Sequence, residues 1–178
     1  MRFTYCPDCG TKLIQKEVGD EGFMPYCDNC KKPLFDMFSS CIIALVANEK
    51  QEVALLRQNY ISTDYYNLAS GYMKPGETAE ETAVREVGEE LGLTINEPKI
   101  TGTYWFDKKD MIMIGFLAET HKTDFKLSGE VDSALWIPAE KALTMVHPKG
   151  SVSHTLVKEY LKTIWCQGIT FGLCLFYG

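Results

Sequence analysis

The chain has 178 residues, of which 46% are hydrophobic, so it can bury one proper core with a small unit beside it. Its net charge of −6 argues against a general nucleic-acid binder, because such proteins carry a basic footprint. No apolar run reaches the ~18 residues of a membrane span, and the polar residues 1–10 do not resemble a signal peptide, so we expect no membrane association and a cytoplasmic location.

Two Cys-x-x-Cys pairs mark residues 1–36 as a separate unit. Cys6/Cys9 and Cys27/Cys30 are separated by 17 residues, the spacing of a four-cysteine zinc site. Four thiolates close the coordination sphere, so the Zn²⁺ would be structural and would stabilise a unit with little core. A redox pair or disulfides are the alternatives, but no thioredoxin-like βαβ pattern precedes the cysteines. Zinc ribbons also bind nucleic acids or proteins, so the metal alone assigns no role.

Residues 37–178 form the second predicted domain, which mixes strands with helices. Apolar and alternating runs predict strands at 41–47, 52–59, 67–72, 98–106, 111–119 and 131–137. Helical periodicity and caps predict helices at 79–91, 139–145 and 152–164. Strands with a few helices packed around them indicate an α/β or α+β sandwich. The apolar end, 163–178, is either an extra strand or a patch buried at a subunit interface.

Three glutamates share one face of the helix predicted at 79–91. Glu86, Glu89 and Glu90 stand at i, i+3 and i+4, and Gly92 follows as a C-cap. Like charges at this spacing repel each other, and a hard divalent cation with oxygen ligands would compensate for the repulsion. A solvated acidic face is the alternative, and the three glutamates alone would favour it.

A longer pattern reverses that preference. Gly71, Glu77, Arg85-Glu86, Glu89-Glu90 and Gly92, with apolar Val87 and Leu93, match every fixed position of the Nudix box. The chain therefore resembles the Nudix hydrolase family. The resemblance implies an α/β/α sandwich with a mixed sheet, preceded here by the zinc ribbon. It also implies metal-dependent hydrolysis of a nucleoside diphosphate linked to another group.

The same helix face suggests the metal ligands. Glu86 and Glu90 lie one turn apart and are the first candidates to bind Mg²⁺ or Mn²⁺, and Glu89 would bind directly or through water. The resemblance adds the backbone carbonyl of Ser70 as a further ligand. Glu130 stands six residues before a tryptophan, as in a family segment that completes the site, and would be a ligand or the base that deprotonates water. A solvated loop glutamate is the alternative reading of Glu130.

The resemblance implies other roles for the remaining box residues. Glu77 and Arg85 would form an ion pair that ties the loop to the helix, with directional bidentate geometry. An exposed pair of negligible strength is the alternative. The helix residues Val84 and Val87, with Ala83 and Leu91, would face away from the carboxylates into the core.

A zinc ribbon followed by a Nudix domain resembles the NADH pyrophosphatase branch of the family. The segment 102–110, Gly-Thr-Tyr-Trp-Phe-Asp-Lys-Lys-Asp, differs from the S-Q-P-W-P-F-P-x-S that this branch usually carries. The large N-terminal domain of the longer members of the branch is also missing from this sequence. Trp105 and Phe106 would stack on a base or belong to the core. Ser153 stands where the branch contacts substrate through its backbone.

These patterns predict a magnesium- or manganese-dependent pyrophosphohydrolase acting on NAD(H), ADP-ribose or a related nucleotide. Hydrolysis of nucleoside triphosphates or nucleotide sugars is a second enzymatic reading. A ligand-sensing regulator with a nucleic-acid- or protein-binding ribbon is a third, which the acidic balance and the complete box disfavour. We expect a nucleotide diphosphate as partner, a homodimer, and no nucleic acid.

Overall fold

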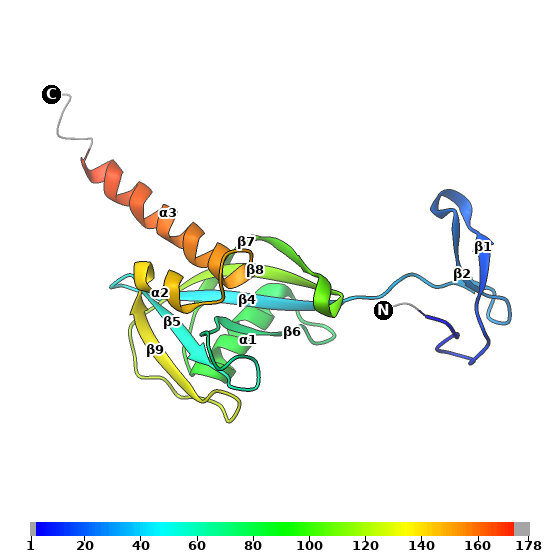
Figure 1. Ribbon diagram of the computed structural model, residues 1–178, viewed down its shortest axis with the longest axis horizontal. Coiled ribbons are helices and arrows are strands. Elements are labelled where there is room, and N and C mark those ends of the chain that lie inside the picture. The colour runs from blue at the N-terminus through cyan, green and yellow to red at the C-terminus, as the bar shows by residue number, and fades with distance from the viewer. Residues whose placement is uncertain (1–2, 173–178) are drawn as a thin grey trace. The chain divides into compact units, whose positions relative to one another are not determined.

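The computed structural model describes residues 3–172, with side chains up to Trp165 (Figure 1). The described chain divides into two compact units. One comprises the residues up to Ser39 together with Asp107–Asp110, and the other comprises the remainder. The boundary between residues 36 and 37 stays a prediction.

The first unit is built on a three-stranded sheet in the order β1-β2-β3. Its strands are antiparallel and comprise β1 (Ile14–Glu17), β2 (Phe23–Cys27) and β3 (Lys32–Pro33). A turn of 3₁₀ helix, η1 (Gly19–Glu21), connects the first two. The buried hydrophobic cluster of this unit comprises Cys6, Cys27 and Leu34, with three half-buried neighbours. So small a core agrees with a unit that needs a metal to hold its fold.

The second unit contains a six-stranded sheet in the order β7-β8-β4-β5-β9, with β6 paired to β4. Its strands are β4 (Ser39–Asn48), β5 (Glu52–Arg57), β6 (Ala69–Tyr72), β7 (Asn96–Phe106), β8 (Met111–Thr120) and β9 (Ser133–Pro138). A 3₁₀ turn, η2 (Asp107–Lys109), separates β7 from β8. The two strands β4 and β8 run in the same direction in Figure 1, whereas β6 pairs antiparallel with β4, and β7 with β8. The sheet is therefore mixed.

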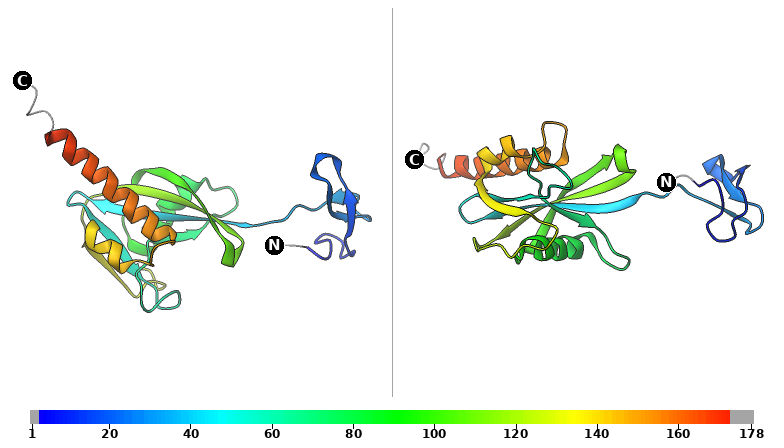
Figure 2. Two further views of the ribbon diagram at one scale, coloured as in Figure 1. Left: turned by 45° about the horizontal axis from the view of Figure 1, so that its top comes forward. Right: turned by 60° about the horizontal axis from the view of Figure 1, so that its bottom comes forward.

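Helices cover both faces of this sheet, as Figure 2 shows. The helix α1 (Ala79–Leu91) packs on one face, and α2 (Ala139–Met145) and α3 (Val152–Gly172) pack on the other. Ile42, Ala44 and Val46 of β4 join the cluster under α1, while the alternate residues join the cluster under α2 and α3. Alternation on a strand covered on both faces explains why residues 41–47 form a continuous apolar run.

Most predicted elements are present, and two predictions are wrong. The helices at 79–91 and 139–145 have the predicted bounds. Residues 163–172 continue α3 and are not a strand, because helical backbone bonding carries on past Ile164; residues 173–178 of the apolar end lie outside the described residues. Val84 is 41% exposed rather than core, because it lies at the edge of the buried stripe of α1.

None of the helices that the structure describes has the length and apolar character of a membrane span.

Candidate active site

The helix α1 is fixed at both ends by side-chain and backbone caps. Thr78 Oγ1 accepts from the Glu81 N–H at 3.2 Å, and Glu81 Oε2 accepts from the Thr78 N–H at 2.8 Å, so the N-terminus carries a capping box. Gly92 ends the helix in the left-handed region, with φ 67°. A Cβ there would also lie 2.5 Å from Lys126 Cβ. These caps fix the first and last residues of α1 and thereby the positions of its glutamates.

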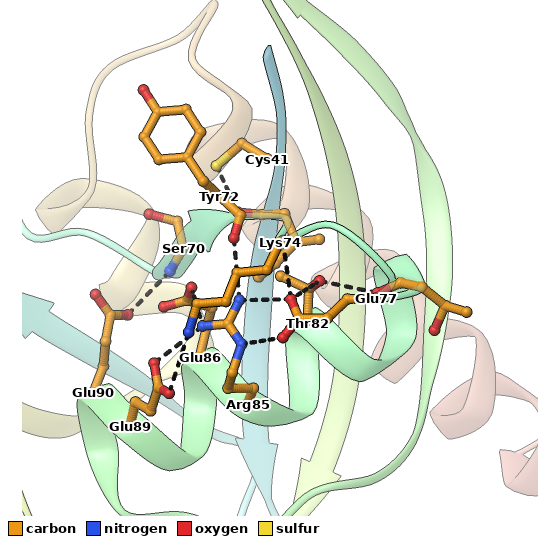
Figure 3. A network of polar contacts seen from close by, with 12 residues as sticks. Cys41, Ser70, Tyr72, Lys74, Glu77, Thr82, Arg85, Glu86, Glu89 and Glu90 are labelled. Carbon is orange, nitrogen blue, oxygen red and sulfur yellow. Dashed lines mark hydrogen bonds and ion pairs between the residues drawn. The ribbon is translucent and has the colours of Figure 1, made fainter.

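Arg85 ties the loop before α1 to the helix (Figure 3). Its Nε and Nη2 donate to the two carboxylate oxygens of Glu77 at 2.7 and 2.9 Å, a bidentate pair. Nη2 also donates to the Tyr72 carbonyl at 3.1 Å. Glu77 accepts further bonds from Thr82 Oγ1 and the Lys74 N–H. The structure thus joins strand β6, the loop and the helix through one guanidinium.

The bond from Arg85 lowers the pKa of Glu77 from its ordinary 4.5 to about 2. A carboxyl whose pKa falls on folding stabilises the protein above its unfolded pKa, and this contribution is lost as the pH falls toward the folded pKa. We therefore expect Glu77→Gln to lower the urea midpoint at pH 7, with a difference from wild type that shrinks steadily below pH 4.5. Glu80→Gln, on an exposed position of the same helix, is the control. A difference that stays constant from pH 7 to pH 3 would contradict the assignment.

Glu86 lies under strand β6, where only glycine leaves room for it. A Cβ on Gly71 would lie 2.0 Å from Glu86 Cδ, so the carboxylate occupies the space that any larger residue would fill. Glu86 Oε1 also accepts from Arg85 Nη1 at 2.6 Å, and its side chain is 14% exposed. The glycine that opens the box therefore sets the position of its central glutamate.

Glu90 is the most enclosed of the three glutamates, at 5% exposed. Its Oε2 accepts from the Ser70 N–H at 3.1 Å, and its Oε1 accepts from Gln58 Nε2 at 2.8 Å. Figure 3 shows the side chain pointing from α1 toward Ser70. Burial, with a smaller contribution from the nearby Glu86 charge, raises the pKa of Glu90 to about 7. The hydrogen bonds from Ser70 and Gln58 offset part of this rise, and a cation close by would favour the ionised form further.

Glu89 points away from the enclosed part of the site. Its side chain is 54% exposed, and it accepts from Arg85 Nη1 at 3.0 Å, while Lys74 Nζ lies 3.8 Å from its other oxygen. The side chain shares the helix face with Glu86 and Glu90, yet solvent reaches it freely. The three glutamates therefore differ in what they can do, although their spacing in the sequence gives no hint of it.

Glu130 is exposed on the loop before β9. It lines a cavity of about 430 Å³ with its neighbours in the loops, namely Asn59, Tyr60, Gly129 and Asp132. Its charge makes a small contribution to the raised pKa of Glu90. Within residues 3–172, no set of three carboxylates brings its oxygens within 4.8 Å of one another.

The other predicted substrate contacts come from β7 and α3 rather than from the box helix. Trp105, 53% exposed, and Phe106 end β7, an edge strand of the sheet. Ser153 is buried in the first turn of α3, on the face of the sheet opposite α1. The sequence reading missed Gln58, which directly follows β5 and reaches Glu90. No motif in the sequence marks this residue.

The four cysteines of the first unit converge on one point. The sulfurs of Cys6, Cys9, Cys27 and Cys30 lie within 4.8 Å of one another. Those of Cys9 and Cys27 are 3.5 Å apart, and those of Cys6 and Cys30 are 3.9 Å apart. Gly10, with φ 72°, turns the chain after the first pair. The group is thus arranged as a set of metal ligands.

Comparison with known families identifies the second unit. Residues 37–157, more than half of the chain, match the NUDIX domain. The chain belongs to the NUDIX family. The predicted family and its fold are thereby confirmed, and the box residues described above lie within the matched range.

Curated relatives extend the similarity beyond the domain. The chain is 28% identical over 162 residues to the "NAD-capped RNA hydrolase NudC" of Photobacterium profundum, and 26% identical over 161 residues to that of Vibrio cholerae. These matches cover 90% of the chain but only 59% and 58% of the relatives. The chain thus spans less than two thirds of their length.

Solved structures show the same fold. A NUDIX hydrolase from Nitrosomonas europaea superposes with a TM-score of 0.71 at 19% identity, covering 90% of this chain and 91% of that one. The NUDIX domain of Shewanella oneidensis NrtR, complexed with ADP ribose, gives a TM-score of 0.60 at 16% identity, with 79% and 94% covered. At these identities the likeness concerns the fold alone.

Proposed function

We propose that the protein is a divalent-metal-dependent pyrophosphohydrolase that cleaves the diphosphate of a nucleotide of the NAD(H) or ADP-ribose type into two monophosphates. The observation that carries this proposal is the packing of the box: Glu86 fills the space next to Gly71 that a side chain would occupy, and Glu90 is buried against the Ser70 N–H. This places two carboxylates one helical turn apart beneath the strand that opens the box.

The donor set fits Mg²⁺ or Mn²⁺. Hard cations of this kind prefer carboxylate and carbonyl oxygens, and the buried Glu90 with its raised pKa lacks the positive charge that would keep it ionised. Glu86 and Glu90 are the proposed principal ligands, with Glu89 and the Ser70 carbonyl as further ones. When bound, such an ion neutralises phosphate charge and lowers the pKa of a coordinated water.

The protein's own groups would organise the reaction around that ion. Arg85 and Glu77 hold the loop before α1 against the helix, which keeps the carboxylates in place. Glu130, exposed beside the cavity of about 430 Å³, is the proposed ligand or acceptor of the proton from the attacking water. Breaking the diphosphate link with one water gives two monophosphates.

The names of similar proteins support the substrate class. Curated relatives are named for hydrolysis of NAD-capped RNA, and the NrtR domain of the same fold binds ADP ribose. Both ligands contain a diphosphate that links two ribose-bearing groups. We propose a free nucleotide of this kind rather than RNA as the substrate, because the net charge of −6 disfavours a polyanion.

A substrate panel tests the proposal. NADH, ADP-ribose, dATP, a nucleotide sugar and NAD-capped RNA are incubated with the protein and Mg²⁺ or Mn²⁺, and the products are identified by mass spectrometry. Reduced nicotinamide mononucleotide and AMP from NADH, or AMP and ribose phosphate from ADP-ribose, would support it. Preferred cleavage of dATP or the nucleotide sugar would favour the second enzymatic reading. Negligible turnover together with salt-dependent nucleic-acid binding would indicate a regulator.

We further propose that the four cysteines bind a structural Zn²⁺. Tetrahedral bonds of about 2.3 Å would separate the sulfurs by about 3.8 Å. The observed separations of 3.5 and 3.9 Å lie on either side of that value. The thiolate set also suits zinc better than a hard cation.

Removal of this zinc should unfold the first unit alone. We expect about one Zn²⁺ per chain by elemental analysis, and Cys27→Ser, at a buried ligand, should lose it. Hydrogen exchange should then accelerate in β1 and β2, while the β4 core keeps its protection, because the two units have separate hydrophobic clusters. Cys41→Ser, a buried cysteine of the other unit, is the control for zinc content. Full zinc content in Cys27→Ser would contradict the assignment.

A homodimer and a cytoplasmic location complete the proposal. The dimer is expected from the apolar end of the sequence, and the location from seven cysteines that suit a reducing compartment. Sedimentation velocity of the purified chain tests the first, and fractionation of cells tests the second.

A further inference from the structure

Tyr60, which the Nudix box does not include, lies beside the candidate site. It is 70% exposed and lines the cavity of about 430 Å³ that also contains Glu130. The loop that carries it is anchored at the preceding residue, because the Asn59 N–H donates to Asp132 Oδ2 at 2.7 Å. The phenol is thus an accessible group on an anchored segment.

Gln58 connects this phenol to the buried carboxylate. Its side chain is 1% exposed, and its Nε2 donates to Glu90 Oε1 at 2.8 Å and to Tyr60 Oη at 3.2 Å. The amide turns its nitrogen toward this carboxylate, and a carboxylate that binds a metal ion accepts hydrogen bonds and donates none. Both hydrogens of the amide nitrogen are therefore used, one toward each partner.

The direction of these bonds leaves one hydrogen available. Tyr60 Oη accepts from Gln58, so its own O–H is free to donate, and no further bond of this hydroxyl occurs among the residues that the structure describes. A tyrosine hydroxyl ordinarily keeps its proton at neutral pH, and partial desolvation with the nearby charge of Glu130 raises the pKa of Tyr60 further. The proton of this hydroxyl is therefore available to a ligand.

The cavity beside this donor is acidic. Glu130 and Asp132 line it together with Asn59, Tyr60 and Gly129, so no lining residue carries a positive charge. A diphosphate would enter it with the divalent cation of the proposed function, and a neutral hydroxyl can donate to a phosphate oxygen that the cation leaves free. The diphosphate of the proposed substrate must also lie close to Glu90, which Gln58 contacts directly.

We propose that Tyr60 is a substrate-contacting residue whose hydroxyl, oriented by Gln58, donates a hydrogen bond to a phosphate oxygen of the nucleotide. This inference rests on the proposed function, because it takes a nucleotide diphosphate as the ligand. Gln58 is a positioning residue that links the substrate contact to the buried Glu90.

Tyr60→Phe tests the contact, since it keeps the ring and removes only the hydroxyl. Binding is measured by calorimetry with α,β-methylene-ADP and Mg²⁺, because this analogue cannot be cleaved at the diphosphate. Loss of a hydrogen bond to a charged group should weaken binding about 10-fold or more. Tyr65→Phe is the matched control from the same loop, where the ring packs against His147 at 5.0 Å between centroids. It should bind as wild type does.

The coupling between the two residues provides a second measurement. Gln58→Met keeps the length of the side chain and removes its donors, so Tyr60 should lose its orientation. If Gln58 acts through the hydroxyl, adding Tyr60→Phe to Gln58→Met should weaken binding by less than it does in wild type. If the loss of affinity in the double variant equals the product of the two single losses, the positioning role is overturned, because a merely structural defect would leave the two losses independent.

The outcomes separate this inference from the proposed function. Wild-type affinity in Tyr60→Phe overturns the contact, and so does absence of wild-type binding to the analogue at millimolar concentration. If the wild type binds the analogue but cleaves nothing in the substrate panel, the proposed hydrolysis fails. The loss of affinity in Tyr60→Phe then still decides the role of the tyrosine.

Discussion

Glu86→Gln should lower kcat by about 10²–10⁴-fold while the fold stays intact. The amide has the size of the carboxylate and can still accept from Arg85 Nη1, which lies 2.6 Å from Glu86 Oε1. It loses the negative charge that a divalent cation requires. Hydrolysis of the best substrate in the panel, followed at saturating concentration, measures the change.

Glu80→Gln is the matched control, because Glu80 occupies an exposed position on the same helix. It should keep the activity and the melting temperature of the wild type. The circular dichroism melt of Glu86→Gln should also match that of the wild type. Wild-type turnover in Glu86→Gln would show that the catalytic assignment is wrong.

Gly71→Ala should reduce activity by about 10²-fold or more with little change in stability, because misplacement of a reacting group by about 1 Å costs that much. The new methyl group would lie 2.0 Å from Glu86 Cδ, so one of them must move. The carboxylate is the end of a flexible side chain and yields more easily than the strand backbone. The helix therefore stays folded, while its central glutamate leaves its place.

Gly88→Ala provides the control for this steric argument. A Cβ there would meet only the Leu93 carbonyl oxygen at 3.8 Å, an ordinary contact. Alanine is also the better helix former by about 1 kcal/mol, so this variant should be slightly more stable and fully active. A Gly71→Ala enzyme with wild-type kcat would refute the claim that this glycine makes room for Glu86.

Local sequence rules predicted the elements that depend on local interactions. The helix from Ala79 to Leu91 has its N-cap at Thr78 and its C-cap at Gly92, and both are decided by neighbouring residues. The continuous apolar run at 41–47 predicted a strand covered on both faces, because it is shorter than a typical buried helix and rich in isoleucine and valine. The end of α3 was not predictable in this way, since an apolar terminal run suits a helix and a strand equally.

By itself, the sequence determined the family, the helix of the box and the two Cys-x-x-Cys pairs of the first unit, because each is set by spacing along the chain. Only the tertiary structure decided which glutamates are enclosed: Glu90 lies against Ser70 and Gln58, whereas Glu89 faces solvent. The tertiary structure also connected Tyr60 to the site through Gln58, which lies 32 positions before Glu90 in the sequence. Burial and hydrogen bonding between distant segments depend on how the sheet and helix pack, and a one-dimensional pattern does not contain that information.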